Sequence, residues 1–188
     1  GALAKAHSVG MVHRDLKPDN VMVSQEGSGE EWVKVLDFGI ARLMEGLEGE
    51  DEEATSLGAV IGSPPYMSPE QIRGEPVDAR SDLYAFGVML YEMLAGRLPF
   101  IADTPLQVLR RTVDEEVPSP RALDRRISAD IEAVCLKCLE KDPLRRYASA
   151  EELAGDLERY LSGEAVLAAQ LNGIRRLARL FERDSPDP

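Results

Sequence analysis

Residues 13–20 read HRDLKPDN, and residues 37–39 read DFG. The segment between them holds two apolar runs separated by a polar turn that contains glycine, and this pattern predicts a β-hairpin. The hairpin would bring Asn20 and Asp37 from its opposite ends towards one place. Amide and carboxylate oxygens are hard ligands that suit magnesium. The two strings together therefore predict a site for phosphate chemistry.

The rest of the chain is predicted to be helical. One helix is expected to begin at Ser81, and its residues are apolar on nearly every face, which indicates a place inside a helical core. Other helices are expected to begin near Pro105 and near Ser128. A capping box of Ser149 with Glu152 predicts one more. The predicted fold class is therefore mainly α with one small β-hairpin.

The composition restricts the class of partner. The chain has 188 residues and a formal net charge of −12. This acidity argues against nucleic acid or an anionic membrane as the main partner, because either polyanion would be repelled. The sequence holds no apolar run of the roughly 18 residues that span a bilayer, so we expect no transmembrane segment in this chain. The length suits one domain that buries roughly 70% of its unfolded surface.

The two cysteines form a CxxC pair, Cys135 and Cys138. Such a pair suggests either a redox centre or half of a zinc site. However, both residues lie on the apolar stripe of a predicted helix, and the sequence has no second CxxC. We therefore interpret them as small buried hydrophobic residues, which agrees with a reducing cytoplasm.

Four features occur in the order and approximate spacing of the eukaryotic-type (Hanks-type) Ser/Thr protein kinases, and they are HRDLKPDN, DFG, GSPPYMSPE and the helix that carries Asp82. The amino-acid sequences of several segments are most similar to those of bacterial members of this family. The resemblance covers residues 1–161 and implies the C-terminal lobe of a kinase domain. In it, residues 13–20 are the catalytic loop and residues 37–70 the activation segment. A complete domain would be α+β, with two lobes.

Residues 162–188 would then be a C-terminal extension with an amphipathic basic helix and a tail. Arg175, Arg176, Arg179 and Arg183 lie largely off its apolar stripe. The helix could touch a membrane or a partner. We favour a terminal helix that packs on its own domain, because patterns with one apolar face mainly indicate core burial.

The resemblance implies a role for each residue of the opening strings. Asp15 would orient the substrate hydroxyl and accept its proton, and Lys17 would meet the transferred phosphate. Asn20 and Asp37 would hold Mg²⁺ against the phosphates of ATP. The implied reaction is phosphoryl transfer from Mg-ATP to Ser and Thr hydroxyls of a protein substrate.

Three neighbouring residues have structural roles in the family. His13 would pack near Phe38, whose position sets where the DFG aspartate points, and Gly39 would give the backbone freedom to turn. His13 could also be read as a general base. We favour the structural role, because Asp15 already holds the place from which a base must act.

The scaffold residues come from later segments. Ser63 stands where many relatives have threonine, and its hydroxyl could still bridge the catalytic aspartate and lysine. Glu70 and Arg146 occupy the positions of a buried ion pair. Asp82 would anchor the catalytic loop by accepting its backbone hydrogen bonds.

A regulatory role is implied for Arg14, which in this family commonly receives a phosphate from the activation loop. Thr55 and Ser56 are the candidates to carry that phosphate, which would order a loop rich in acidic residues. The alternative is that both are ordinary polar loop residues.

An N-terminal lobe with a Gly-rich loop, a strand lysine and a helix glutamate is not found before His13. We therefore expect the chain to be a fragment of a cytoplasmic Ser/Thr kinase and inactive alone. The alternatives are a non-catalytic interaction module and a small-molecule phosphotransferase of the kinase-like superfamily. Bacterial members often continue into a transmembrane segment, so an anchor in the parent protein beyond residue 188 stays open.

Overall fold

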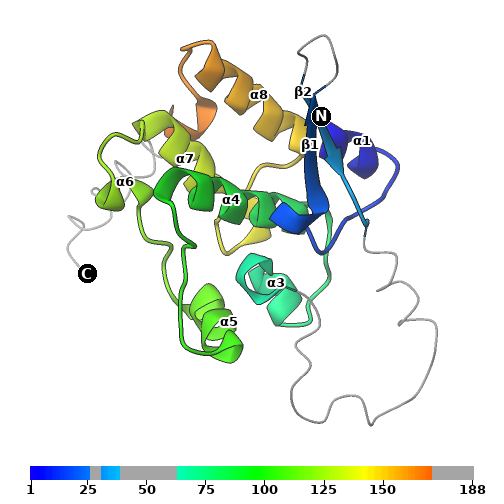
Figure 1. The fold of residues 1–188 in the computed structure, drawn as a ribbon, viewed down its shortest axis with the longest axis vertical. Helices are drawn as coiled ribbons and strands as arrows, with labels where there is room; N and C mark the ends of the chain where they lie inside the picture. The colour runs from blue at the N-terminus through cyan, green and yellow to red at the C-terminus, as the bar shows by residue number, and fades with distance from the viewer. Residues whose placement is uncertain (26–30, 39–62, 171–188) are drawn as a thin grey trace, which may run out of the picture.

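The computed structural model describes residues 1–25, 31–38 and 63–170. Helices make up most of this part, and the two strands form one small sheet (Figure 1). The helices are α1 (Ala2–His7), α3 (Pro69–Ile72), α4 (Ala79–Ala95), α5 (Pro105–Asp114), α6 (Pro120–Leu123), α7 (Ala129–Cys138) and α8 (Ala150–Leu161), with 3₁₀ turns η1 (Pro18–Asn20), η2 (Pro64–Tyr66) and η3 (Pro143–Arg145).

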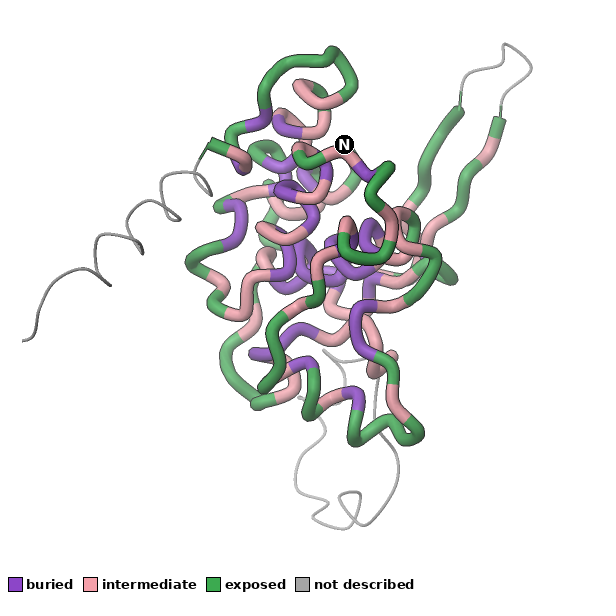
Figure 2. The backbone as a smooth tube through the Cα atoms, turned by 90° about the vertical axis from the view of Figure 1, so that its left-hand side faces the viewer, coloured by how far each residue is buried: buried purple, intermediate pink, exposed green. Residues whose placement is uncertain are grey.

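The predicted hairpin is confirmed. Strands β1 (Val21–Gln25) and β2 (Glu31–Val35) pair antiparallel, with Val21 opposite Val35. Its outer part is exposed and extends away from the helical body (Figure 2). One more bond, from the Leu36 N–H to the Asn20 carbonyl at 2.8 Å, continues the pairing past the strands. The catalytic string and the DFG string therefore meet at the same end of the hairpin.

Helix α4 runs through the middle of the molecule (Figure 1). It begins at Ala79, two residues before the predicted start at Ser81, because the Asp78 side chain accepts a bond from the N–H of Arg80 at 2.8 Å and caps the helix. The helix ends at Ala95, with Gly96 as its C-terminal cap. That glycine has a φ of 68°, which is the left-handed conformation that commonly ends a helix.

Helix α7 packs against α4 through the cysteine pair. Cys135 and Cys138 are fully buried and free, and the Cys135 thiol lies 3.6 Å from the Gly87 carbonyl oxygen of α4. Burial raises the pKa of both thiols, that of Cys135 to about 12. In the described part of the chain, no cluster of three or more His, Cys, Asp or Glu side chains could hold a metal. The interpretation of these cysteines as core residues is confirmed.

Hydroxyl side chains begin α5, α7 and α8 at the predicted positions. The side chains of Thr104, Ser128 and Ser149 each accept a bond from a backbone N–H of the first turn. The capping box is wrong in one detail. The Glu152 carboxylate accepts the N–H of Ala148 at 3.0 Å instead of the N–H of the capping serine.

The core continues past the end of α8. The buried Asp156 carboxylate accepts the N–H groups of Leu167, at 2.8 Å, and of Ala168, at 3.0 Å. Val166 and Ala168 belong to the same hydrophobic core as the earlier helices. Val166 and Ala168 of the predicted extension therefore pack on the helical body. The basic part of that extension, residues 171–188, lies outside the described residues.

No described helix is both long and apolar enough to cross a membrane.

Candidate functional site

Asp82 holds the catalytic string in place. The buried carboxylate accepts the backbone N–H of His13 at 2.8 Å and that of Arg14 at 2.9 Å. These contacts confirm the expected anchoring. The ring of His7, in α1, makes a third contact with the same carboxylate at 2.8 Å. Asp82 therefore ties two segments of the chain, α1 and the catalytic string, to the central helix.

The backbone is strained at two points of the site. Arg14 has a φ of 66° and Asp37 a φ of 50°, which is the left-handed region that residues with a side chain seldom occupy. Such conformations cost of order 1–3 kcal/mol each and persist only where the surroundings impose them. One precedes Asp15 directly, and the other is the DFG aspartate itself.

Asp15, Lys17 and Ser63 form a connected polar group. The Lys17 ammonium lies 3.2 Å from the Asp15 carboxylate and donates to the Ser63 hydroxyl at 2.9 Å. The Ser63 hydroxyl thus makes the Lys17 contact of the expected bridge, but it makes no hydrogen bond to Asp15 within the described residues. The carboxylate of Asp15 is partly exposed, so a hydroxyl substrate can approach it.

The orientation of the Asn20 amide follows from its partner. Its nitrogen donates to the Asp15 carbonyl at 2.8 Å, which leaves the amide oxygen free to bind a cation. Asp37 lies at the same end of the hairpin, and its side chain is exposed. Two oxygen ligands from the protein suit Mg²⁺, which usually takes its other ligands from substrate phosphates and water.

His13 has no free ring nitrogen. Its Nε2 lies 2.8 Å from the Leu36 carbonyl, which can only accept, and its Nδ1 accepts the N–H of Asp15 at 3.3 Å. The buried ring also packs on Phe38, with 4.9 Å between ring centroids. This geometry supports the structural role and leaves His13 unable to act as a general base.

Glu70 and Arg146 form the expected buried ion pair. Both carboxylate oxygens lie 2.7 Å from the guanidinium, and the Ser81 hydroxyl donates to the same carboxylate at 2.5 Å. Burial alone would raise the pKa of Glu70, but the bonds from Arg146 and Ser81 hold it below its usual value. The pair fixes the first turn of α3, where the predicted activation segment ends at Glu70, to the helical body.

Comparison with known proteins agrees with this arrangement. The sequence matches the protein kinase domain family over residues 1–156. The chain belongs to the protein kinase family. Within it, similar proteins include bacterial Ser/Thr kinases, so the resemblance drawn from the sequence is confirmed.

Relatives in that family are much longer than this chain. A probable serine/threonine-protein kinase of Streptomyces coelicolor is 48% identical over 172 residues, which are 92% of this chain and 24% of the relative. PknB of Mycobacterium tuberculosis is 45% identical over 163 residues, 87% of this chain and 25% of the relative. A probable PknB of Bifidobacterium longum is 40% identical over an alignment of 190 residues, which covers 98% of this chain and 26% of the relative. The chain therefore spans about a quarter of the length of these kinases.

Some of the residues that the kinase resemblance singles out lie outside the described residues, and they are Gly39, Thr55 and Ser56. The Arg14 guanidinium makes no hydrogen bond or ion pair within residues 1–25, 31–38 and 63–170. A phosphate on the activation loop as the partner of Arg14 stays a prediction.

Three contacts of the kinase site were not expected from the sequence. His7 reaches Asp82, the Gln71 amide donates to the Arg14 carbonyl at 2.7 Å, and the Tyr66 hydroxyl donates to Glu92 at 2.8 Å. Burial and the Glu92 carboxylate raise the pKa of Tyr66. The partners lie 75, 57 and 26 positions apart in the sequence. No local pattern signals contacts at such separations.

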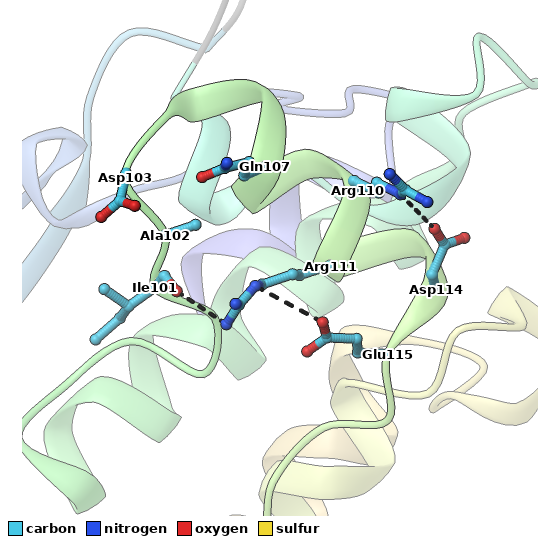
Figure 3. Close-up of a pocket in the computed structure, with 8 residues that line it drawn as sticks. All are labelled: Ile101, Ala102, Asp103, Gln107, Arg110, Arg111, Asp114 and Glu115. Carbon is cyan, nitrogen blue, oxygen red and sulfur yellow. Dashed lines mark hydrogen bonds and ion pairs between the residues drawn. The ribbon is translucent and has the colours of Figure 1, made fainter.

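A hollow of about 640 Å³ lies on α5 (Figure 3). Four of the charged side chains that line it pair with one another, Arg110 with Asp114 at 3.5 Å and Arg111 with Glu115 at 3.6 Å. A second hollow of about 350 Å³ is mainly apolar and lies beside the hairpin, α1 and α8. No candidate catalytic side chain lines either hollow.

Proposed function

We propose that this chain is the C-terminal lobe of an ATP-dependent Ser/Thr protein kinase. The parent protein would transfer a phosphoryl group from Mg-ATP to Ser and Thr hydroxyls of protein substrates. The observation that carries this proposal is the grouping of Asp15, Lys17 and Asn20 around one strained loop, with Asp37 at the adjoining end of the hairpin.

Asp15 acts as the base in this proposal. Its partly exposed carboxylate accepts the proton of the substrate hydroxyl while the hydroxyl oxygen bonds to the γ-phosphorus and the bond from that phosphorus to the β-phosphate oxygen breaks. The Lys17 ammonium, 3.2 Å from that carboxylate, neutralises charge on the phosphoryl group. Held by Ser63 as well, the lysine needs little reorganisation during the reaction.

Mg²⁺ would be held by the amide oxygen of Asn20 and the carboxylate of Asp37. When bound, the ion draws charge from the phosphates of the nucleotide. The hairpin register fixes the separation of the two ligands, because the bond from the Leu36 N–H to the Asn20 carbonyl sits directly beside them.

We propose that nucleotide binding also requires residues of the parent protein outside these 188. No Gly-rich loop or strand lysine precedes His13 in this chain, and we propose that the chain alone is inactive. The phosphate on Thr55 or Ser56 would pair with the Arg14 guanidinium and order the activation segment. A reducing cytoplasm is the proposed place of action, with protein substrate and ATP as partners and no nucleic acid.

A comparison of the complete protein with the 188-residue chain tests the proposal. Both are incubated with Mg-ATP labelled at the γ-phosphate and a general protein substrate, and the phosphorylated residue type is identified after hydrolysis. We expect phosphoserine or phosphothreonine with the complete protein and none with the chain alone. A complete protein that binds its partners but transfers no phosphate would favour the interaction module.

A further inference from the structure

The side chain of Gln71 bridges α3 (Pro69–Ile72), which we call the activation-segment anchor, and the catalytic loop. Its amide nitrogen donates to the carbonyl oxygen of Arg14 at 2.7 Å. Its amide oxygen accepts the backbone N–H of Ser68 at 3.0 Å and the Ser68 hydroxyl at 3.1 Å. One side chain therefore joins the first turn of α3 to the residue before Asp15.

The orientation of this amide is fixed by its partners. An N–H and an O–H of Ser68 converge on one end of the amide, and a carbonyl, which can only accept, faces the other end. Turning the amide over would place oxygen against the Arg14 carbonyl and NH₂ against the Ser68 N–H. The donor is thus held towards the catalytic loop.

The Arg14 carbonyl belongs to a peptide group that carries Asp15. Arg14 has a φ of 66°, so its backbone is held in a conformation that it would not adopt freely. Asp82 holds the N–H of Arg14 at 2.9 Å, and Gln71 holds its carbonyl at 2.7 Å. The strained residue is therefore clamped at both its amide and its carbonyl.

The clamp has a rigid support. Gln71 follows Glu70 directly, and Glu70 is fixed to the helical body by Arg146 and Ser81. Movement of α3 would therefore move the donor that holds the Arg14 carbonyl. This links the placement of the activation-segment anchor to the direction of the Asp15 carboxylate.

We propose that Gln71 is a positioning residue for Asp15, acting through the Arg14–Asp15 peptide group. This inference rests on the proposed kinase function. A displacement of about 1 Å at a catalytic group can cost up to about 100-fold in rate. Loss of the Gln71 bond is therefore expected to lower kcat while the affinity for ATP stays unchanged.

Two substitutions of Gln71 in the complete kinase separate bridging from capping. Gln71→Glu keeps an oxygen for the two Ser68 donors but has no donor for the Arg14 carbonyl, whereas Gln71→Met loses both contacts and adds no charge. Gln107→Glu, on an exposed position of α5, is the matched control for added charge. We expect a fall in kcat of about 10- to 100-fold for both Gln71 variants, with KM for ATP as in the wild type. The control should keep the wild-type kcat.

Hydrogen exchange in the peptide that covers residues 13–17 gives a readout that needs no activity. Both Gln71 variants should exchange faster there than the wild type and the Gln107→Glu control. Wild-type kcat in both variants, or unchanged exchange in both, would overturn the proposal. A loss of kcat in Gln71→Met alone would overturn it too, because it would indicate that the Ser68 cap matters and the bond to Arg14 does not. A loss in Gln71→Glu alone would overturn it as a charge effect. A wild type that transfers no phosphate would refute the proposed function, and the exchange result would still decide whether Gln71 holds the loop.

Discussion

Replacement of Arg146 by methionine removes a guanidinium that makes five hydrogen bonds in the interior. Two of these bonds go to the Glu70 carboxylate, which is 2% exposed, and the other three go to backbone carbonyls. The variant leaves a buried carboxylate with the Ser81 hydroxyl as its remaining side-chain donor. Breaking a buried pair from one side costs about 3–5 kcal/mol, so we expect the free energy of unfolding to fall by about 4 kcal/mol.

Urea denaturation of the complete kinase domain at neutral pH, followed by circular dichroism, measures this loss. Arg126→Met is the matched control, because Arg126 also pairs with a carboxylate but its side chain is 92% exposed. The control should leave the unfolding midpoint unchanged. The double variant Glu70→Leu, Arg146→Met should be more stable than Arg146→Met alone, since it leaves no buried charge unpaired.

The pH dependence of the same measurement has a defined sign. The folded-state pKa of Glu70 lies below its ordinary value of 4.5. Its contribution to stability is therefore present above the unfolded-state pKa and is lost as the pH falls through the folded-state value. Glu70→Gln should remove this acid-dependent part. An Arg146→Met variant that unfolds at the same urea concentration as Arg126→Met would refute the claim that breaking the buried Glu70–Arg146 pair is costly.

Other predictions concern packing and the C-terminal segment. Gly87→Ala should destabilise the domain by about 1–3 kcal/mol, because a Cβ there would lie 2.6 Å from the Cβ of Cys138. Gly155→Ala, at a position of α8 where a Cβ meets no clash, should stabilise the domain by about 0.5–1 kcal/mol in the same denaturation assay. The two thiols should react with a thiol reagent only after unfolding, since both are buried with raised pKa values, and fast labelling of Cys135 in the native protein would contradict this. Asp156→Ala should expose the chain after α8 to limited proteolysis, and a wild-type cleavage pattern would show that the carboxylate does not hold that segment.

Much of the fold follows from local sequence chemistry. The hairpin is predictable because its turn and two apolar runs are contiguous. The starts of α5, α7 and α8 are predictable because a capping hydroxyl acts on the first turn that follows it. Helix α4 begins two residues before the predicted start, because Asp78 and not Ser81 provides the cap.

Contacts between segments that are distant in the sequence have no such local signal. The Glu70–Arg146 pair and the anchoring by Asp82 were expected only because motifs of a known family carry them. The contacts of His7 with Asp82 and of Gln71 with Arg14 belong to no motif. Their partners lie 75 and 57 positions apart and meet only when the whole fold forms. The same holds for the capping of residues 167 and 168 by Asp156, since a buried aspartate within a helix looks like a surface residue in the sequence.

The assignment of Asp15 as the base is tested most directly by single-turnover phosphoryl transfer with Asp15→Asn in the complete protein. Asp103→Asn, at an exposed position, is the control. The contacts of the Asp15 backbone with Asn20 and His13 do not involve its carboxylate, so the variant should fold and bind Mg-ATP as the wild type does. We predict a rate lower by about 10²–10⁴-fold for Asp15→Asn and an unchanged rate for the control. Transfer to a protein substrate at close to the wild-type rate by Asp15→Asn would contradict the account.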